Sequence, residues 1–277
     1  MKTILVPVDF SSHSEYALEV AASIARKQNA EIVVVHMLGL PDSFLTNDQK
    51  QEVFNAIYFM KLTKKKFDKF LDKDYLEGID ISQAVKTHKV FSEINEVAKE
   101  YEADLIVMGS HGAAGVKEVF IGSNTEKVVR TAEIPVLVIK DRVKDFNIKN
   151  AVFVTDFSLE TLKTFMSARK FFKAFGVSPK ILFINIPEKF ISSKEMELKA
   201  YNFLVDVGMD NEKFSDDIIF FDDYTVERGI FNYCNEKEID AIAIPTHGRK
   251  GVGHFFFGSI GEDVANHSEI PVVTFKI

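Results

Sequence analysis

Short, mainly apolar runs alternate with amphipathic segments along the chain of 277 residues. Apolar strands that alternate with amphipathic helices predict a parallel sheet covered by helices on both faces. In the first half we expect five strands, at Ile4–Val8, Glu31–Met37, Ile79–Thr87, Asp104–Met108 and Val136–Ile139. Between them we expect helices, the first capped by Ser11 or Ser12 and the others at Asp48–Leu71, Phe91–Glu100 and Ser123–Ala132.

The same pattern occurs twice in the chain. Ile4–Ser11 reads ILVPVDFS, and Ala151–Ser158, 147 residues later, reads AVFVTDFS. Asp104–Lys140 and Asp240–Lys276, separated by 136 residues, share 16 of their 37 positions. A period of this length is too long for a solenoid unit and indicates a duplicated domain. We therefore expect two domains, at residues 1–142 and 147–277, the second shortened by 11 residues in its middle.

Charge and cysteine content exclude several classes of function. The net charge is −7, and residues 1–145 carry 19 basic and 22 acidic side chains, so that neither half is a basic module for binding nucleic acid. A single cysteine, Cys234, allows neither an internal disulfide nor a thiolate metal cluster, and we expect it in the core. No apolar run is long enough to span a membrane or to resemble a secretion signal, which favours a cytoplasmic protein without a membrane partner.

A glycine-rich segment, GSHGAAGVKEVFIGS at Gly109–Ser123, joins the fourth expected strand to the next helix. In parallel sheets, ligands lie at the carboxyl ends of the strands, where the strand order switches. The ends of the first two strands, Pro7–Asp9 and His36–Met37, are expected to meet the glycines there. The N–H groups and the positive dipole end of the helix opened by Gly122 and Ser123 predict an anion site.

These residues alone leave a structural interpretation open. Glycine-rich loops between a strand and a helix are common, and a serine at the start of a helix often serves only as its N-cap. The chain contains neither G-x-x-x-x-G-K-[ST] nor G-x-G-x-x-G, the two common phosphate-binding motifs.

Taken together, the motifs resemble those of the universal stress protein family. The nucleotide motif of that family, G-x2-G-x9-G-[ST], is matched by Gly109, Gly112, Gly122 and Ser123 without a gap. Its first strand, which ends in Pro-x-Asp-x-Ser, and its closing strand have counterparts at Pro7–Ser11 and in IPVLVI at 134–139. The resemblance covers both halves, so that the chain looks like a tandem member.

The resemblance implies an α/β fold of two Rossmann-like domains of the adenine nucleotide alpha hydrolase type, each with a five-stranded parallel sheet. It implies binding of ATP, or of ADP or AMP, with Mg²⁺ bound through the phosphates. By position, Pro7, Val8, Asp9 and Met37 would contact adenine and ribose, Gly109, Ser110, His111 and Gly112 would surround the ribose and phosphates, and Gly122, Ser123 and Asn124 would hold the terminal phosphates. Members of the family pair through their fifth strands, which predicts an internal pseudo-dimer of the two halves and a possible homodimer.

The second half departs from the motif. Pro245 stands where the first half has Gly109, and proline removes an N–H group and fixes φ. Asp156, Gly248, Gly258 and Ser259 remain, and three phenylalanines at 255–257 lie within the loop. We therefore expect nucleotide in the first half and weak or no binding in the second.

Three functions compete at this stage. The first is a nucleotide-binding regulatory protein of the stress response. The second is an enzyme, at most a slow ATPase, because no catalytic base or activated nucleophile is recognisable, and His111 and His247 are better explained by packing over their loops than by acid–base catalysis. The third is a binding scaffold whose ligand is not a nucleotide.

Overall fold

The computed structural model describes the chain except for residues 38–48, 87–92, 111–121, 210–214, 247–263 and 266. The first half contains β1 (Thr3–Pro7), α1 (Ser12–Gln28), β2 (Glu31–Met37), α2 (Gln49–Phe70), β3 (Ile81–Lys86), α3 (Ile94–Glu100), β4 (Leu105–Gly109), α4 (Ser123–Thr131) and β5 (Val136–Ile139). The second contains β6 (Ala151–Val154), α5 (Leu162–Lys173), β7 (Lys180–Asn185), α6 (Ser193–Asp206), β8 (Ile218–Asp222), α8 (Val226–Glu236), β9 (Ala241–Thr246) and β10 (Val272–Lys276). The expected alternation of strands and helices is confirmed, with shifts of one to three residues at most boundaries.

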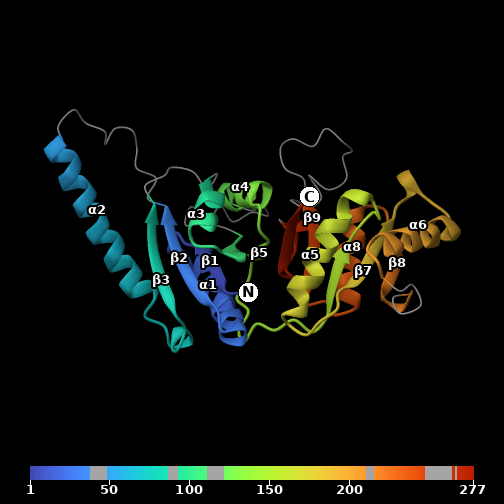
Figure 1. Cartoon of the computed structure of the whole chain (residues 1–277), viewed down its shortest axis with the longest axis horizontal. Coiled ribbons are helices and arrows are strands. Elements are labelled where there is room, and N and C mark those ends of the chain that lie inside the picture. Colours follow the sequence, from blue (N-terminus) through green and yellow to red (C-terminus); the bar gives the residue numbers. More distant parts are fainter. Residues whose placement is uncertain (38–48, 87–92, 111–121, 210–214, 247–263, 266) are drawn as a thin grey trace.

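The strands of both halves form one sheet (Figure 1) in the order β3-β2-β1-β4-β5-β10-β9-β6-β7-β8. Within each half the neighbouring strands run parallel, as the apolar pattern predicts. The halves meet where β5 and β10 pair antiparallel, with Leu137 opposite Val273. The expected pseudo-dimer is therefore present as a continuous mixed sheet, with α2 and α6 at its opposite ends.

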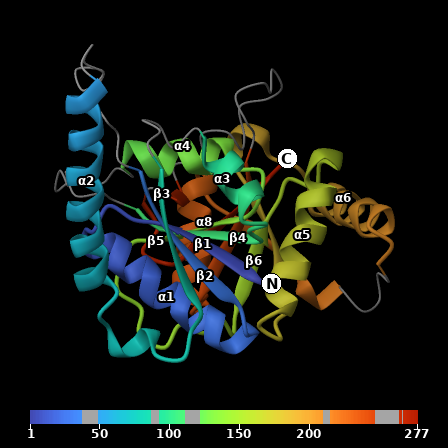
Figure 2. The same ribbon diagram turned by 60° about the vertical axis from the view of Figure 1, so that its left-hand side comes forward.

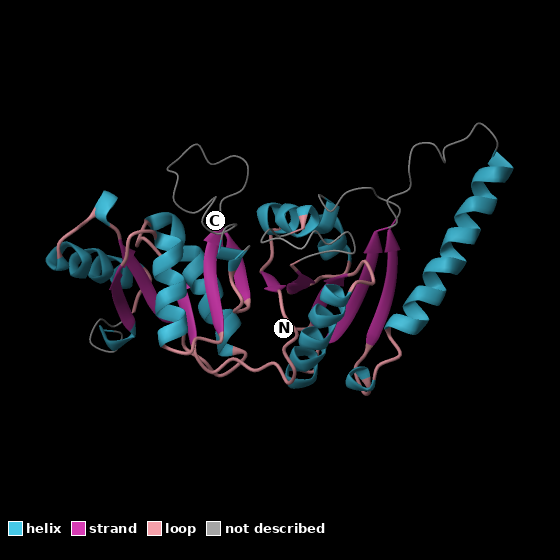
Figure 3. Cartoon of the chain, turned by 180° about the vertical axis from the view of Figure 1, so that it is seen from behind, coloured by secondary structure: helices cyan, strands magenta, loops and turns pink. Residues whose placement is uncertain are grey.

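Helices cover both faces of this sheet (Figures 2 and 3). Successive residues of a strand point to opposite faces, so that Ile4 and Val6 join one core and Leu5 joins the other. The first core packs against α1, α5 and α6, and the second against α3, α4 and α8. Each core contains residues from both halves, which makes the two repeats one packing unit.

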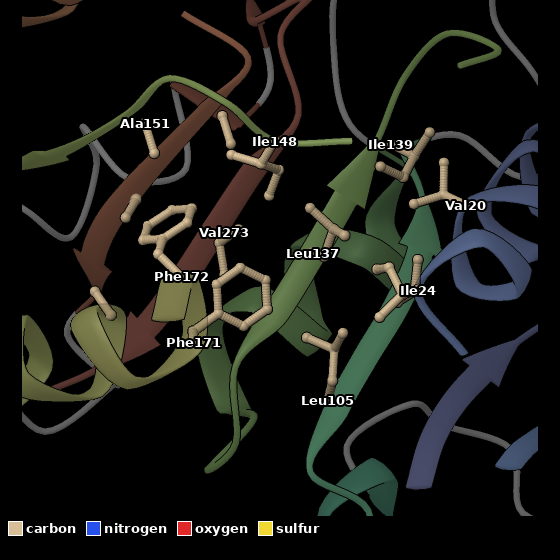
Figure 4. Close-up of a cluster of buried hydrophobic side chains, with 14 of the residues drawn as sticks. Val20, Ile24, Leu105, Leu137, Ile139, Ile148, Ala151, Phe171, Phe172 and Val273 are labelled. Atoms are coloured by element: carbon tan, nitrogen blue, oxygen red, sulfur yellow. The ribbon is translucent and has the colours of Figure 1, made fainter. Parts of the chain in front are cut away.

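The junction between the halves is apolar at its centre and polar at its edge. Figure 4 shows Leu137 of β5 and Val273 of β10 within one cluster that also includes Ile24 of α1 and Phe171 of α5. At the edge, the guanidinium of Arg142 donates to the carboxylate of Glu19, with 2.7 Å between Nε and Oε2. Lys27 Nζ of α1 donates to the carbonyl oxygen of Phe146 in the connecting segment, at 2.9 Å. Lys276 Nζ of β10 donates to the carbonyl oxygen of Arg130 in α4, at 2.7 Å, and so joins the two halves.

No helix in the part of the chain that the structure describes is long and apolar enough to cross a membrane. Cys234 is completely buried in α8, as expected from its sequence context.

Candidate functional site

The turn from β1 into α1 forms the first side of the candidate site. Val8 continues the ladder beyond β1 by donating its N–H to the carbonyl oxygen of Val35, at 2.8 Å. The Asp9 carboxylate accepts the N–H of Ser11 at 3.0 Å, and Ser11 is the N-cap of α1. Between them, Phe10 has a φ of +66°, a conformation uncommon for a residue other than glycine. The chain thus turns sharply at the carboxyl end of β1, next to the end of β2.

The start of α4 forms the second side of the site. Two hydrogen bonds hold it beside the end of β4: Gly122 N–H donates to the carbonyl oxygen of Ser110 at 2.7 Å, and the Thr125 hydroxyl donates to that of Gly109 at 2.8 Å. The N-cap of α4 is Gly122, which has no side chain that could cap the helix. Its first turn therefore presents backbone donors and a positive dipole end at the strand termini, where an anion can bind.

The predicted site residues differ in how accessible they are. Ser123 and Asn124 are exposed, whereas Asp9, Met37 and Gly122 are half-buried. Within the described residues, the remaining predicted contacts are buried: Pro7, Val8, Gly109 and Ser110. His111 and Gly112 lie outside the described residues. The predicted site residues are therefore of two kinds: those at the ends of β1 and β4 are mostly buried, whereas those at the start of α4 are exposed.

Gly109 has a structural role that the motif does not reveal. A Cβ atom built on Gly109 would lie 2.6 Å from both the carbonyl carbon and the carbonyl oxygen of His13 in α1. Carbon atoms in proteins do not approach backbone so closely, so any other residue at this position must push α1 away from β4. Close packing of a helix on a strand therefore accounts for this glycine even before a ligand is considered.

Pro245 occupies the matching position in β9, opposite Phe275 of β10. The pairing of β6 with β9 ends at Ala243, so the missing N–H of the proline breaks no described rung of that ladder. Proline carries a Cβ, and the second half does not repeat the start of α1: a 3-10 turn at Leu159–Thr161 precedes α5.

A small aromatic cluster lies at the turn from β1 into α1. The ring of Phe10 lies 4.5 Å from that of His36 and 5.2 Å from that of Phe67, measured between centroids. The Nδ1 atom of His36 is 2.7 Å from the carbonyl oxygen of Val8, so the neutral imidazole donates its Nδ1 proton there. Burial lowers the pKa of His36 below 6.5, and the nearby ammonium of Lys66 lowers it further. His36 is therefore neutral at pH 7 and ties the ends of β1 and β2 together.

In the second half a phenylalanine takes the place of His36. The bonds from Val8 to Val35 and from Thr155 to Leu182 are equivalent, which makes Phe183 the counterpart of His36. Phe157, the counterpart of Phe10, also has a positive φ, +61°, and its ring stacks on that of Phe183 at 5.4 Å. The two repeats share a phenylalanine with positive φ at this turn. The ring beside it is the titratable imidazole of His36 in the first half and the apolar ring of Phe183 in the second.

Two features of this site were not predicted from the sequence: the turn at Phe10 and the hydrogen bond of the Thr125 hydroxyl. The phenylalanine of the repeated Asp-Phe-Ser was one available signal, because a side chain kept at the same place in both repeats needs an explanation. Thr125 gave no comparable signal, because its counterpart under the 136-residue offset is Gly261.

Comparison with known proteins agrees with the duplicated architecture. The profile of the universal stress protein family matches residues 1–140 and 147–276. One universal stress protein of Methanocaldococcus jannaschii is 30% identical to this chain, over 52% of the chain and 85% of its own length. A second from the same organism is 28% identical, over 50% of the chain and 94% of its own length. These curated relatives thus correspond to one half of the chain.

Some solved structures match the whole chain and others match half of it. A universal stress protein from Archaeoglobus fulgidus covers 99% of this chain and 98% of its own, with a TM-score of 0.65 and 20% identity, which supports the fold. A universal stress protein solved in complex with cAMP matches half of the chain, with 23% identity, 96% of its own length covered and a TM-score of 0.36. The family profile alone covers nearly every residue, and the chain therefore belongs to the universal stress protein family, with two copies of the family domain in tandem.

Proposed function

We propose that this protein binds an adenine nucleotide, ATP or its products ADP and AMP, in residues 1–142 and acts as a nucleotide-responsive regulatory protein. The observation that carries the proposal is the start of α4. Gly122 leaves the helix without a side-chain cap, and hydrogen bonds from Gly122 and Thr125 hold this uncapped end against the terminus of β4. Phosphate oxygens are suitable acceptors for N–H groups arranged in this way.

The described residues fit the remaining parts of a nucleotide. Asp9 is half-buried at the end of β1, where its carboxylate can accept hydrogen bonds from ribose hydroxyls. Met37 is half-buried at the end of β2, where its backbone can contact the base. Mg²⁺ would be bound through phosphate oxygens, which suit its preference for hard ligands. The described part of the chain contains no group of three or more His, Cys, Asp or Glu side chains that could hold a metal ion.

A regulatory role requires that the nucleotide bind one state of the protein more tightly than another. The carbonyl oxygen of Arg130, in the last turn of α4, accepts a hydrogen bond from Lys276 of the second half. Phosphates at the other end of the same helix could therefore influence the junction between the halves. The second half, at residues 147–277, would bind nucleotide weakly or not at all, because its motif contains Pro245.

The first test is to denature the purified protein and identify any released nucleotide by mass. One adenine nucleotide per chain supports the proposal, and two would show that Pro245 is tolerated. Protein that releases none is then titrated with Mg-ATP by calorimetry, and the absence of binding would rule the proposal out.

A substitution can separate binding from folding. Gly122 has a φ of −58° and a ψ of 140°, which aspartate can adopt, so Gly122→Asp supplies a carboxylate cap and should change stability by only a few tenths of a kcal/mol. The same carboxylate repels phosphate, and we expect ATP affinity to fall more than about tenfold. The matched control is Gly258→Asp, at the corresponding position of the second motif, which should leave ATP affinity unchanged.

A further inference from the structure

The second half contains a pocket that the nucleotide proposal does not use. It has a volume of about 530 Å³ and lies at the carboxyl ends of β7 and β8, towards the end of the sheet remote from β1. Its lining residues are Asn185, Ile186, Pro187, Phe190, Asp222, Asp223 and Tyr224. The volume is within the range of small-molecule sites. We propose that this pocket binds a planar aromatic molecule that carries a positive charge, such as an aromatic amine.

The aromatic part of the proposal rests on two side chains at the mouth of the pocket. Phe190 is 69% exposed and Tyr224 is 71% exposed, a high exposure for large rings that line a concave surface. Ile186 and Pro187 add apolar surface between the strand ends. A flat ring placed here would remove these apolar surfaces from water and could stack on either aromatic face.

The charge of the proposed ligand follows from Asp222 and Asp223. Asp223 is already neutralised: it forms an ion pair with Arg228, 3.2 Å from Nε to Oδ1, and accepts a hydrogen bond from Asn232 at 2.7 Å. Asp222 is exposed, and its hydrogen-bond donor among the described residues is the uncharged amide of Asn185, at 2.9 Å. A negative charge without a cationic partner in the described residues therefore lies at the pocket, which favours a cation and disfavours an anion.

Hydrogen bonds hold the walls of the pocket in place before any ligand binds. Asn185 is buried, and its amide donates to the carbonyl oxygen of Ile191 at 3.3 Å and accepts the N–H of Ile191 at 3.2 Å. This fixes the loop that carries Phe190. The guanidinium of Arg228 lies over the ring of Tyr224, 5.2 Å from its centroid, and holds that side chain. A preformed site loses less conformational entropy on binding.

The chain has no tryptophan, so the fluorescence of an indole probe can be recorded without tryptophan background from the protein. Fluorescence anisotropy of tryptamine, an indole cation, is titrated with the full-length protein, and indole-3-propionate serves as the anionic counterpart. We expect tryptamine to bind at least about tenfold more tightly than the anion. Equal affinities, or no binding of tryptamine, would overturn the proposal.

Substitutions then assign the binding to the pocket. Phe190→Leu and Tyr224→Leu should each weaken tryptamine binding about fivefold, and Asp222→Asn should remove most of the preference for the cation. The control is Tyr201→Leu, because Tyr201 is 54% exposed on α6 and does not line the pocket. A loss in this control equal to that in Tyr224→Leu, or displacement of tryptamine by ATP, would place the probe elsewhere and contradict the assignment. All the substituted side chains are exposed, so the fold should be retained.

Discussion

The Nδ1 atom of His36 lies 2.7 Å from the carbonyl oxygen of Val8, so that an imidazole closes the gap between the ends of β1 and β2. In the second half the equivalent side chain is Phe183, which cannot make this bond. The equivalent position in the two repeats is therefore filled by a polar ring in the first half and by an apolar ring in the second. Only the first repeat should respond to pH at this position.

We expect His36 to make the stability of the protein depend on pH. Burial lowers the pKa of His36 below 6.5 in the folded state, with Lys66 lowering it further and Asp9 and the Val8 bond opposing the shift. Below pH 6.5 the unfolded state binds the proton more readily, so the contribution of His36 is complete above pH 6.5 and is lost as the pH falls through its folded pKa. His36→Phe, which copies the second half, should remove this dependence.

The measurement is the free energy of unfolding in urea for both proteins, from pH about 7.5 to about 5. The difference between wild type and His36→Phe should move in favour of the variant as the pH falls. The control is the reciprocal change, Phe183→His, which places a histidine at the equivalent position of the second half. A difference that stays constant over this range would contradict the interpretation.

Replacing Gly109 should destabilise the fold by itself. The Cβ of Gly109→Ala would overlap the backbone of His13, and relieving such an overlap typically costs about 1–3 kcal/mol. Urea unfolding of the variant measures this cost. Met108→Leu, a change of similar volume at the preceding buried residue, should cost less than about 1.5 kcal/mol. If Gly109→Ala is as stable as wild type, the contact with α1 is looser than described.

Cys234 should react with thiol reagents only when the second half unfolds. Its side chain is completely buried, and burial raises the pKa of the thiol to about 12, so that the reactive thiolate is scarce at neutral pH. The rate of modification by an aromatic disulfide, measured against urea concentration, should follow unfolding. Ser167→Cys, which adds a thiol on the exposed surface of α5, should react at once. Rapid modification of Cys234 in the native wild type would show that α8 opens locally.

The two halves should unfold together. Leu137 is completely buried at the junction, and Leu137→Ala should cost about 2–5 kcal/mol. Because each core spans both halves, the substitution in the first half should also accelerate modification of Cys234 in the second. Leu159→Ala, at a residue 72% exposed, is the control and should change stability by less than about 0.5 kcal/mol. Unchanged Cys234 reactivity in Leu137→Ala would show that the halves unfold independently.

The sequence by itself determined the elements of this protein and their duplication. Strand and helix periods are properties of short segments, and the repeated Asp-Phe-Ser and Glu-Ile-Pro-Val are visible at offsets of 147 and 136 residues without coordinates. The motif from Gly109 to Ser123 likewise predicted where α4 begins, because a glycine followed by a polar residue is a local signal for a helix start.

The tertiary structure decided the relationships between distant segments. The contact of Gly109 with His13 joins residues far apart in the chain, and its cause is a distance between a helix and a strand that no local pattern encodes. The exchange of His36 for Phe183 became visible only through equivalent ladder bonds, because the repeat is weak in the second strand. The pocket beside Asp222 depends on loops from two strands and on the position of Tyr224. Such features arise from packing between elements, which the period of each element leaves undetermined.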